Sequence, residues 1–207
     1  GQATCAVQGF GNVGSISAKL IAMQGVKITA ISDVSGAYYN DKGIDIDGAI
    51  EYVQNNKGTL EGYTEADKMT GDELLSMNVD LLVPAAMEDV ITAENAGKIN
   101  ARLIVEGANG PTAAEADEIL RQRDVKVVPD ILANAGGVSV SYFEWVQNRL
   151  GYFWTEERVN RRADRMMKQA FESVFEMAEK YDITLRLAAY VLAIDKVART
   201  KKLRGIF

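Results

Sequence analysis

Three glycines near the beginning of the chain, Gly9, Gly11 and Gly14, stand in the spacing G-x-G-x-x-G. In a turn between a strand and a helix, the first glycine allows the tight turn, the second lets a pyrophosphate approach the backbone, and the third lets the helix pack against the strand. The residues before them, 3–7, are small or β-branched apart from one cysteine, so a short buried strand is expected there. The spacing therefore predicts a glycine turn built to hold a phosphate.

The residues after the glycines complete a dinucleotide-binding βαβ pattern. A helix is expected over 13–23, and its N-terminus would offer unpaired N–H groups and the positive end of its dipole to an anion. A second apolar run, 26–31, ends close to Asp33, which lies 19 residues after Gly14. A carboxylate at that distance is typical of the acid that holds an adenosine ribose. The simpler alternative is a structural turn in an ordinary α/β sheet, with Asp33 as a solvated loop acid.

Composition excludes several classes of function. The chain has 207 residues, a net charge of −6 and no histidine. The acidic balance argues against a nucleic-acid surface, and the lack of histidine removes the Ser-His-Asp and Cys-His arrangements. The single cysteine, Cys5, is expected to be buried in the first strand, which leaves no disulfide and fits a cytoplasmic protein. No apolar run approaches a membrane span, and no metal site is expected.

Alternating elements follow, and then helices alone. Further strands are expected over 79–83, 102–105 and 126–128, and further helices over 138–148, 155–180 and 185–201. This order predicts an α/β fold with a doubly wound, mostly parallel, Rossmann-like sheet over residues 1–150. A helical C-terminal extension, residues 151–207, is expected to pack on that core.

Local signals place several turns and helix ends. Thr70 and Thr112 each precede a glutamate by three residues, which is a capping-box pattern, so a helix is expected to begin at both. Turns or loops are expected over 38–43, 59–68 and 129–137, and a helix over 92–98.

The loops that leave the predicted strands are rich in small residues and asparagines. Ligands of open parallel sheets bind at the carboxyl ends of the strands, so these loops are expected to meet at one edge. Ala85 and Ala86 leave room for a flat ligand, while Asn109 and Asn134 each offer a donor and an acceptor, as a nicotinamide carboxamide and a ribose require. Alternatively, each asparagine only satisfies loop backbone.

Several segments resemble one enzyme family over essentially the whole chain. GFGNVG, VPAA, VEGANGPT and above all NAGGVSVSYFEWVQN resemble the C-terminal, cofactor-binding domain of hexameric glutamate dehydrogenases, as does LRLAAYVLAIDKV near the end. These enzymes belong to the glutamate/leucine/phenylalanine/valine dehydrogenase family. The resemblance implies reversible oxidative deamination of L-glutamate to 2-oxoglutarate and ammonia with NAD(P), carried out by a homohexamer.

The resemblance also implies roles for particular residues. The cofactor would be held by Gly9, Phe10, Gly11, Asn12, Val13, Gly14, Asp33, Ala85, Ala86, Asn109 and Asn134. Val138 and Ser141 would reach the substrate, with Ser141 donating to the side-chain carboxylate of glutamate. Relatives that act on leucine or phenylalanine carry an apolar residue at that position, and a buried hydroxyl serves a carboxylate better than an apolar side chain. Without the family, Ser141 would be interpreted as a helix-surface serine.

The resemblance covers only the cofactor half of the enzymes. Their catalytic lysine and aspartate lie in an N-terminal substrate domain, and no lysine here matches that motif, so no catalytic residue is assigned. The chain is therefore expected to be an excised domain that binds cofactor without turnover. A free-standing dinucleotide-binding or sensor module is the alternative. Asp33 would repel a 2′-phosphate, and no lysine or arginine lies between it and Lys42, which favours NAD. NADP stays possible, because similar NADP enzymes can keep an acid nearby.

Overall fold

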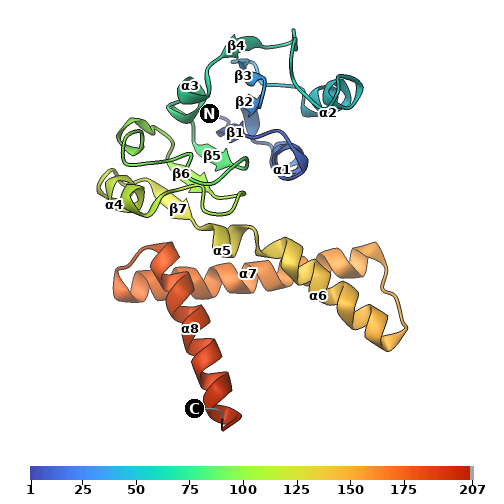
Figure 1. Cartoon of the computed structure of the whole chain (residues 1–207), viewed down its shortest axis with the longest axis vertical. Coiled ribbons are helices and arrows are strands. Elements are labelled where there is room, and N and C mark those ends of the chain that lie inside the picture. The colour runs from blue at the N-terminus through green and yellow to red at the C-terminus, as the bar shows by residue number, and fades with distance from the viewer. Residues whose placement is uncertain (206–207) are drawn as a thin grey trace. The chain divides into compact units, whose positions relative to one another are not determined.

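A seven-stranded sheet with the order β4-β3-β2-β1-β5-β6-β7 forms the centre of residues 1–130 (Figure 1). Its strands are β1 (Thr4–Gln8), β2 (Lys27–Asp33), β3 (Gly36–Tyr39), β4 (Asp67–Met69), β5 (Leu81–Pro84), β6 (Leu103–Val105) and β7 (Lys126–Val128). Strands β2, β1, β5, β6 and β7 run parallel, while β3 and β4 add an antiparallel edge. The computed structural model describes residues 1–205.

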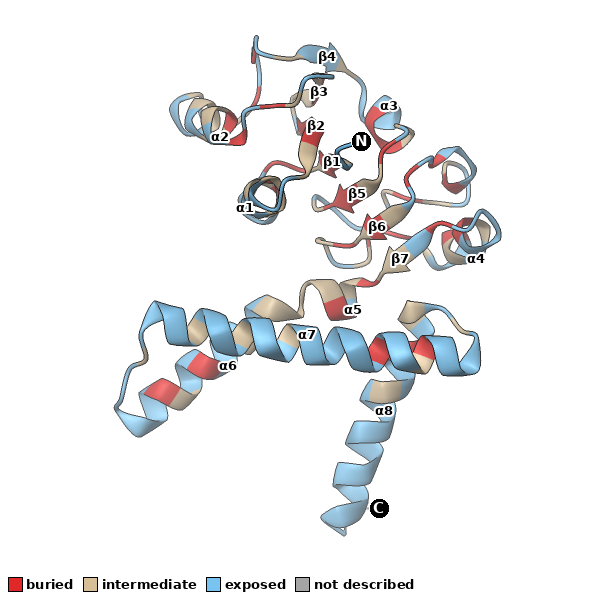
Figure 2. Cartoon of the chain, turned by 180° about the vertical axis from the view of Figure 1, so that it is seen from behind, coloured by how far each residue is buried: buried red, intermediate tan, exposed pale blue. Residues whose placement is uncertain are grey.

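Helices cover both faces of this sheet (Figure 1). They are α1 (Asn12–Met23), α2 (Ile46–Asn55), α3 (Gly71–Leu75), the 3₁₀ helix η1 (Ala96–Lys98) and α4 (Ala114–Gln122). Side chains alternate along a strand, so Val7 of β1 joins a buried cluster with α1 and α2, while its neighbour Ala6 joins another with α3, η1 and α4. Figure 2 shows the buried residues on the strands and on the helix faces turned toward them. The predicted doubly wound, mostly parallel, Rossmann-like sheet is confirmed.

Cys5 is buried within β1, as predicted. Burial raises the pKa of its thiol to about 12, because a thiolate is poorly solvated in the apolar core. Cys5 therefore stays protonated at neutral pH and acts as a small core residue, not as a nucleophile.

Four of the local predictions differ from the structure, two of them because of long-range contacts. The turn expected over 38–43 begins too early, because Tyr38 and Tyr39 pair with β2 as part of β3, and the Tyr38 ring meets Tyr63 edge-on. Thr70 caps α3 in a capping box as predicted, but Thr112 does not cap α4. Instead, the Thr112 backbone bridges to Ile91. The helix expected over 92–98 is only the single turn η1, and the surface segment expected over 59–68 ends in β4.

Helices make up the second unit, which begins at residue 131. Helix α5 (Asp130–Ala133) starts at the boundary, and α6 (Ala135–Leu150), α7 (Glu156–Tyr181) and α8 (Leu185–Leu203) follow. The loop expected over 129–137 is thus wrong, since most of it is helical. Helix α6 packs on α7 and α7 on α8, so α6 belongs with the tail helices, and the units divide at residue 130 where the sequence predicted 150.

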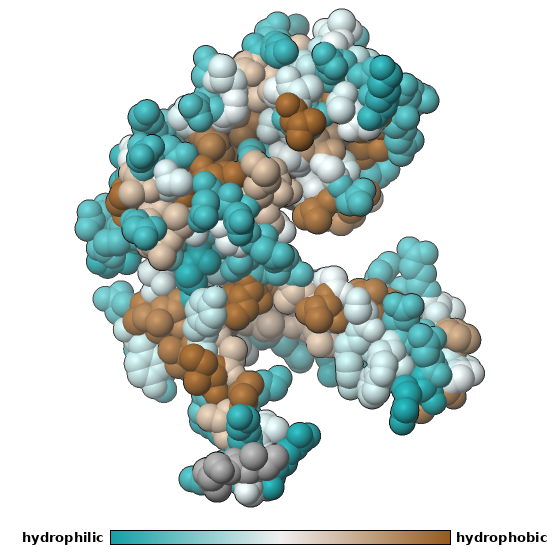
Figure 3. Space-filling view, in the orientation of Figure 1, coloured by the Kyte–Doolittle hydropathy of each residue, from teal (hydrophilic) through white to brown (hydrophobic). Residues whose placement is uncertain are grey.

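The connection between α6 and α7 is held by a buried amide. Gln147 donates from Nε2 to the Phe143 carbonyl at 3.1 Å, and its Oε1 accepts from the Trp154 backbone N–H at 2.6 Å. Farther on, α7 and α8 are exposed along most of their length (Figure 2), and hydrophobic side chains gather on α8 (Figure 3). The exposed apolar residues of α8 include Leu187, Val191, Ile194 and Val197. No described helix is long and apolar enough to cross a membrane.

Candidate dinucleotide site

The glycine turn lies between β1 and α1, where the sequence predicted it. Gly9 has a φ of +96°, a conformation that side chains disfavour, and a Cβ on it would lie 2.8 Å from the Ala86 backbone nitrogen. Its own N–H donates to the Ser32 carbonyl at the end of β2. Gly9 is therefore required by both its backbone angle and the close approach of a neighbouring loop.

Gly14 and Gly11 differ sharply in what surrounds them. A Cβ on Gly14 would lie 1.7 Å from the Gly9 carbonyl oxygen, so α1 contacts the turn backbone directly. A Cβ on Gly11, the residue that precedes α1, would meet nothing within 4 Å. Gly14 thus serves packing, whereas Gly11 leaves open space at the N-terminus of a twelve-residue helix.

The side chains around the turn divide into buried and exposed ones. Phe10 is buried in the core, so its side chain cannot line a ligand, and any contact with one would come from its backbone. Asn12 and Val13 begin α1 and are exposed. The exposed start of α1 is thus what this turn offers to an anion.

Two loops converge beside the glycine turn and the start of α1. Gly107 and Ala108, which follow β6, both donate their backbone N–H groups to the Pro84 carbonyl, at 2.9 and 3.0 Å. A Cβ on Gly107 would lie 3.1 Å from the Ala85 Cβ and 3.4 Å from a Val13 methyl group. The start of α1, the loop after β5 and the loop after β6 therefore meet at the carboxyl edge of the sheet, as expected for an open parallel sheet.

Asp33 ends β2 at the same edge and is held by its neighbours. Its Oδ1 accepts from the Ser35 backbone N–H at 2.8 Å and from the Ser35 hydroxyl at 2.5 Å, while its Oδ2 accepts from the Leu60 backbone N–H at 2.6 Å. Asp33 is therefore held by two neighbouring segments and is not a freely moving loop side chain. Sequence reasoning missed Ser35, although an aspartate two residues before a serine is a turn signal.

Two further acids at this edge were also missed. Glu106 directly follows β6 and has no exposed surface, and its Oε2 accepts the Asp130 backbone N–H at 2.8 Å. The Asp130 carboxylate in turn accepts the Gly110 N–H at 2.8 Å. An acidic residue directly after an apolar strand is the sequence signal that could have identified Glu106.

Asn134, Val138 and Ser141 belong to the second unit. Asn134 precedes α6, and Val138 and Ser141 lie one turn apart on an exposed face of that helix. Trp145 continues this face one turn farther on, with its ring stacked on Tyr142 at 5.9 Å between centroids. The predicted site residues therefore come from both units, with the cofactor positions before Asn134 gathered in the first.

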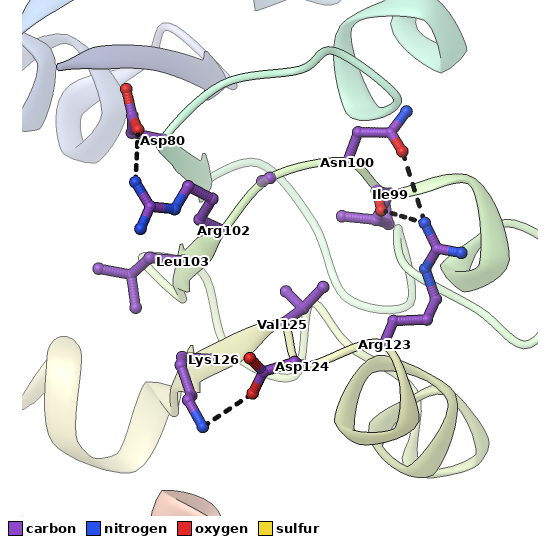
Figure 4. Close-up of a pocket in the computed structure, with 10 residues that line it drawn as sticks. Asp80, Ile99, Asn100, Arg102, Leu103, Arg123, Asp124, Val125 and Lys126 are labelled. Carbon is purple, nitrogen blue, oxygen red and sulfur yellow. Dashed lines mark hydrogen bonds and ion pairs between the residues drawn. The ribbon is translucent and has the colours of Figure 1, made fainter. Parts of the chain in front are cut away.

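A separate cavity of about 650 Å³ opens at the amino ends of β5, β6 and β7 (Figure 4). Its charged groups are paired: Arg102 with Asp80 at 3.3 Å, and Lys126 with Asp124 at 3.1 Å. Arg123 donates to the Ile99 carbonyl at 3.0 Å. Because these strands are parallel, the cavity lies at the edge of the sheet opposite the glycine turn, so it is not part of the candidate dinucleotide site.

Asp80 at this cavity gives the fold a dependence on pH. The Thr4 backbone N–H, at 2.9 Å, lowers the pKa of the Asp80 carboxyl, with help from the Thr4 hydroxyl and Arg102. A pKa that is lower in the folded than in the unfolded chain stabilises the fold above the unfolded value, and this stability is lost as pH falls through the folded value. Stability should therefore fall below about pH 4, and Asp80→Asn should make that fall shallower.

Urea unfolding at a series of pH values between about 6 and 2 measures this effect. Asp124→Asn is the matched control, because its exposed ion pair with Lys126 should contribute little to stability at any pH. If the free energy of unfolding fell equally with pH in Asp80→Asn and in the unchanged chain, the Thr4 contact would have no role in acid unfolding.

Comparison with known proteins agrees with this geometry. The family model for glutamate/leucine/phenylalanine/valine dehydrogenases matches residues 1–205. A glutamate dehydrogenase from Thermotoga maritima is 52% identical over the whole chain, which covers 50% of that protein. An NADP-specific glutamate dehydrogenase A1 from Halobacterium salinarum is 49% identical over 94% of the chain and 47% of its own length.

A solved structure agrees as well. The crystal structure of glutamate dehydrogenase from Peptoniphilus asaccharolyticus superposes with a TM-score of 0.84 and 43% identity, over 99% of this chain and 48% of that one. The chain thus spans about half the length of the curated relatives it matches. With a family model that matches nearly every residue and a doubly wound sheet that carries the glycine turn, the chain belongs to the glutamate/leucine/phenylalanine/valine dehydrogenase family.

Proposed function

We propose that this chain is the cofactor-binding part of a glutamate dehydrogenase and that it binds NAD at the carboxyl edge of its sheet. The observation that carries the proposal is the open space at Gly11, at the N-terminus of α1, with the loops after β5 and β6 beside it. A side chain on Gly11 would fill this space, which a pyrophosphate needs in order to reach the helix N–H groups. The residues present therefore fit a dinucleotide.

Each residue of the proposed site has a binding task. The N-terminus of α1 would hold the pyrophosphate, and Asp33 would accept hydrogen bonds from the adenosine ribose hydroxyls. The carboxylate would also repel the 2′-phosphate of NADP, and the sequence from Asp33 to Lys42 contains no lysine or arginine to offset this before Lys42. The Lys68 side chain lies beside Gly36, the partner of Asp33 in the pairing of β2 with β3, and is the nearby cation that weakens this repulsion. Preference for NAD is proposed on these grounds, although one relative at 49% identity is NADP-specific.

The substrate and the reaction are proposed on the family resemblance. NAD would supply the acceptor for the hydride that leaves the α-carbon of L-glutamate, giving 2-oxoglutarate and ammonia after hydrolysis of the imine. Ser141 would donate a hydrogen bond to the side-chain carboxylate, which supports glutamate over leucine or phenylalanine. The catalytic lysine and aspartate would lie in the other half of a protein as long as the relatives, assembled as a cytoplasmic homohexamer. The 207-residue chain by itself would then bind cofactor without turnover.

Calorimetric titration with NAD and NADP, each at fixed salt, tests the cofactor proposal. We expect saturable binding of NAD, weaker binding of NADP and no oxidation of glutamate. Asp33→Ser should reduce the preference for NAD by about tenfold, because removal of one close negative charge is worth roughly 1–2 kcal/mol against a phosphate in a partly exposed site.

Asp33 also holds the Ser35 turn and Leu60, so its replacement changes structure as well as charge. Ser35→Ala is the matched control: it removes one hydrogen bond from the same carboxylate but keeps the charge. It should leave the NAD preference unchanged. Failure of the unchanged chain to bind either cofactor would contradict the proposed function, and turnover of glutamate would contradict the assignment of catalysis to another half. Binding with no NAD preference would leave only the choice of cofactor wrong.

A further inference from the structure

Glu106 is a charged side chain with no exposed surface, and it directly follows β6 at the carboxyl edge of the sheet. A buried carboxylate is costly unless hydrogen bonds compensate for its lost hydration. Glu106 is followed directly by the 107–110 loop, which contains Asn109, one of the proposed cofactor residues. A carboxylate at this position can accept hydrogen bonds from backbone N–H groups, which an apolar side chain could not do.

Two carboxylates connect this loop to the segment after β7. Glu106 Oε2 accepts the Asp130 backbone N–H at 2.8 Å, and Asp130 Oδ2 accepts the Gly110 backbone N–H at 2.8 Å. The Glu106 N–H also donates to the Val128 carbonyl at 3.1 Å. Each carboxylate thus holds a backbone group of the other segment, and the two segments are connected reciprocally.

The same loop is anchored on its other side. The Ala108 N–H donates to the Pro84 carbonyl at 3.0 Å, and the Gly110 carbonyl accepts from the Asp89 N–H at 2.9 Å. Gly110 has a φ of +55°, which turns the chain sharply just after Asn109. Asn109 therefore stands between two residues whose backbone positions are fixed by hydrogen bonds, and one of these bonds ends on Asp130.

We propose that Glu106 and Asp130 are positioning residues that hold the 107–110 loop so that Asn109 faces the nicotinamide half of a bound dinucleotide. This inference rests on the proposed function. Asp33 ends β2 and Asn109 follows β6, with β1 and β5 between them in the sheet. Three strand spacings of about 4.8 Å separate the two positions by about 14 Å. The loop and the acid that would hold the adenosine ribose therefore lie toward opposite ends of the site.

This separation gives the proposal a selective signature. Loss of the carboxylates should weaken binding of the whole dinucleotide, because the loop would no longer present Asn109 in one conformation. Binding of adenosine monophosphate, which would contact the glycine turn and Asp33, should be unaffected. A purely structural contribution to the fold would change both affinities together or neither.

The experiment is calorimetric titration of the unchanged chain and four variants, once with NAD and once with adenosine monophosphate. Glu106→Ala and Asp130→Ala should weaken NAD at least about tenfold, the effect of losing one well-placed charge-assisted hydrogen bond. Their affinity for adenosine monophosphate should stay within about twofold of the unchanged chain. Glu106→Gln and Asp130→Asn keep an oxygen that accepts a backbone N–H, so they should recover most of the NAD affinity.

Asp124→Ala is the control, since this exposed acid lies at the opposite edge of the sheet and should change neither affinity. Each variant is first checked by thermal unfolding. Should Glu106→Ala fail to fold, the half-buried Asp130 provides the same test. Parallel losses of NAD and adenosine monophosphate, or unchanged NAD affinity in Asp130→Ala, would overturn the inference. If the unchanged chain bound neither ligand, the proposed function would fail first, which distinguishes the two failures.

Discussion

Gly14→Ala is expected to lower the free energy of unfolding by about 3 kcal/mol, at the upper end of the range for overpacked cores. The added Cβ would lie 1.7 Å from the Gly9 carbonyl oxygen and 2.9 Å from the Gly9 carbonyl carbon. Both are backbone atoms, so no side-chain rotation can relieve the overlap, and α1 must move away from β1. The better helix propensity of alanine, worth about 1 kcal/mol, offsets only part of this cost.

Urea unfolding followed by circular dichroism measures this loss. Gly11→Ala is the matched control: it makes the same chemical change three residues earlier, where a Cβ meets nothing within 4 Å and φ is −83°. Its cost should stay below about 1 kcal/mol, the difference between glycine and alanine just before a helix. Similar losses for the two variants would show that the contact between α1 and the turn is not what makes Gly14 necessary.

Gly11→Ala is expected instead to weaken NAD binding by about ten- to a hundredfold while the chain stays folded. Under the proposed function, its Cβ would occupy the space through which a pyrophosphate reaches the N–H groups of α1. Charge-assisted hydrogen bonds of this kind are worth about 1.5–3 kcal/mol each, and every 1.4 kcal/mol is a factor of ten in affinity. The measurement is calorimetric titration with NAD at fixed salt.

Gly97→Ala is the control for this second prediction. Gly97 lies in η1, is exposed, and would also accept a Cβ without any contact within 4 Å. It should leave NAD affinity unchanged, because η1 connects to the amino end of β6, away from the glycine turn. Undiminished NAD affinity in Gly11→Ala would place the pyrophosphate somewhere other than at the start of α1.

The βαβ unit was predictable because its determinants lie close together in the sequence. The first 33 residues contain the apolar run of β1, the three glycines and Asp33. The structure places the glycine turn and Asp33 at the carboxyl ends of the neighbouring strands β1 and β2. Continuous apolar runs likewise marked the later parallel strands, since strands buried on both faces need no polar alternation. The long helices α7 and α8 were likewise predicted, over 155–180 and 185–201, within one to two residues of their observed ends.

Predictions failed where distant segments decide the local structure. Tyr38 and Tyr39 read as a turn beside Asn40, but pairing with β2 and packing against Tyr63 make them part of a strand. Thr112 matched a capping box, yet its backbone bridges to Ile91, twenty-one positions earlier, and α4 begins after Ala113 instead. In both cases tertiary pairing outweighed a weak local preference.

The sequence by itself determined the fold class and the position of the glycine turn, because these depend on spacing along the chain. Only the tertiary structure decided how the residues are held. Asp33 accepts from Leu60 across 27 positions, and Glu106 accepts from Asp130 across 24. Such bonds exist only once the strands of the sheet bring their carboxyl ends together, since a polar group buried at that edge must find its partner in whichever loop the fold places beside it.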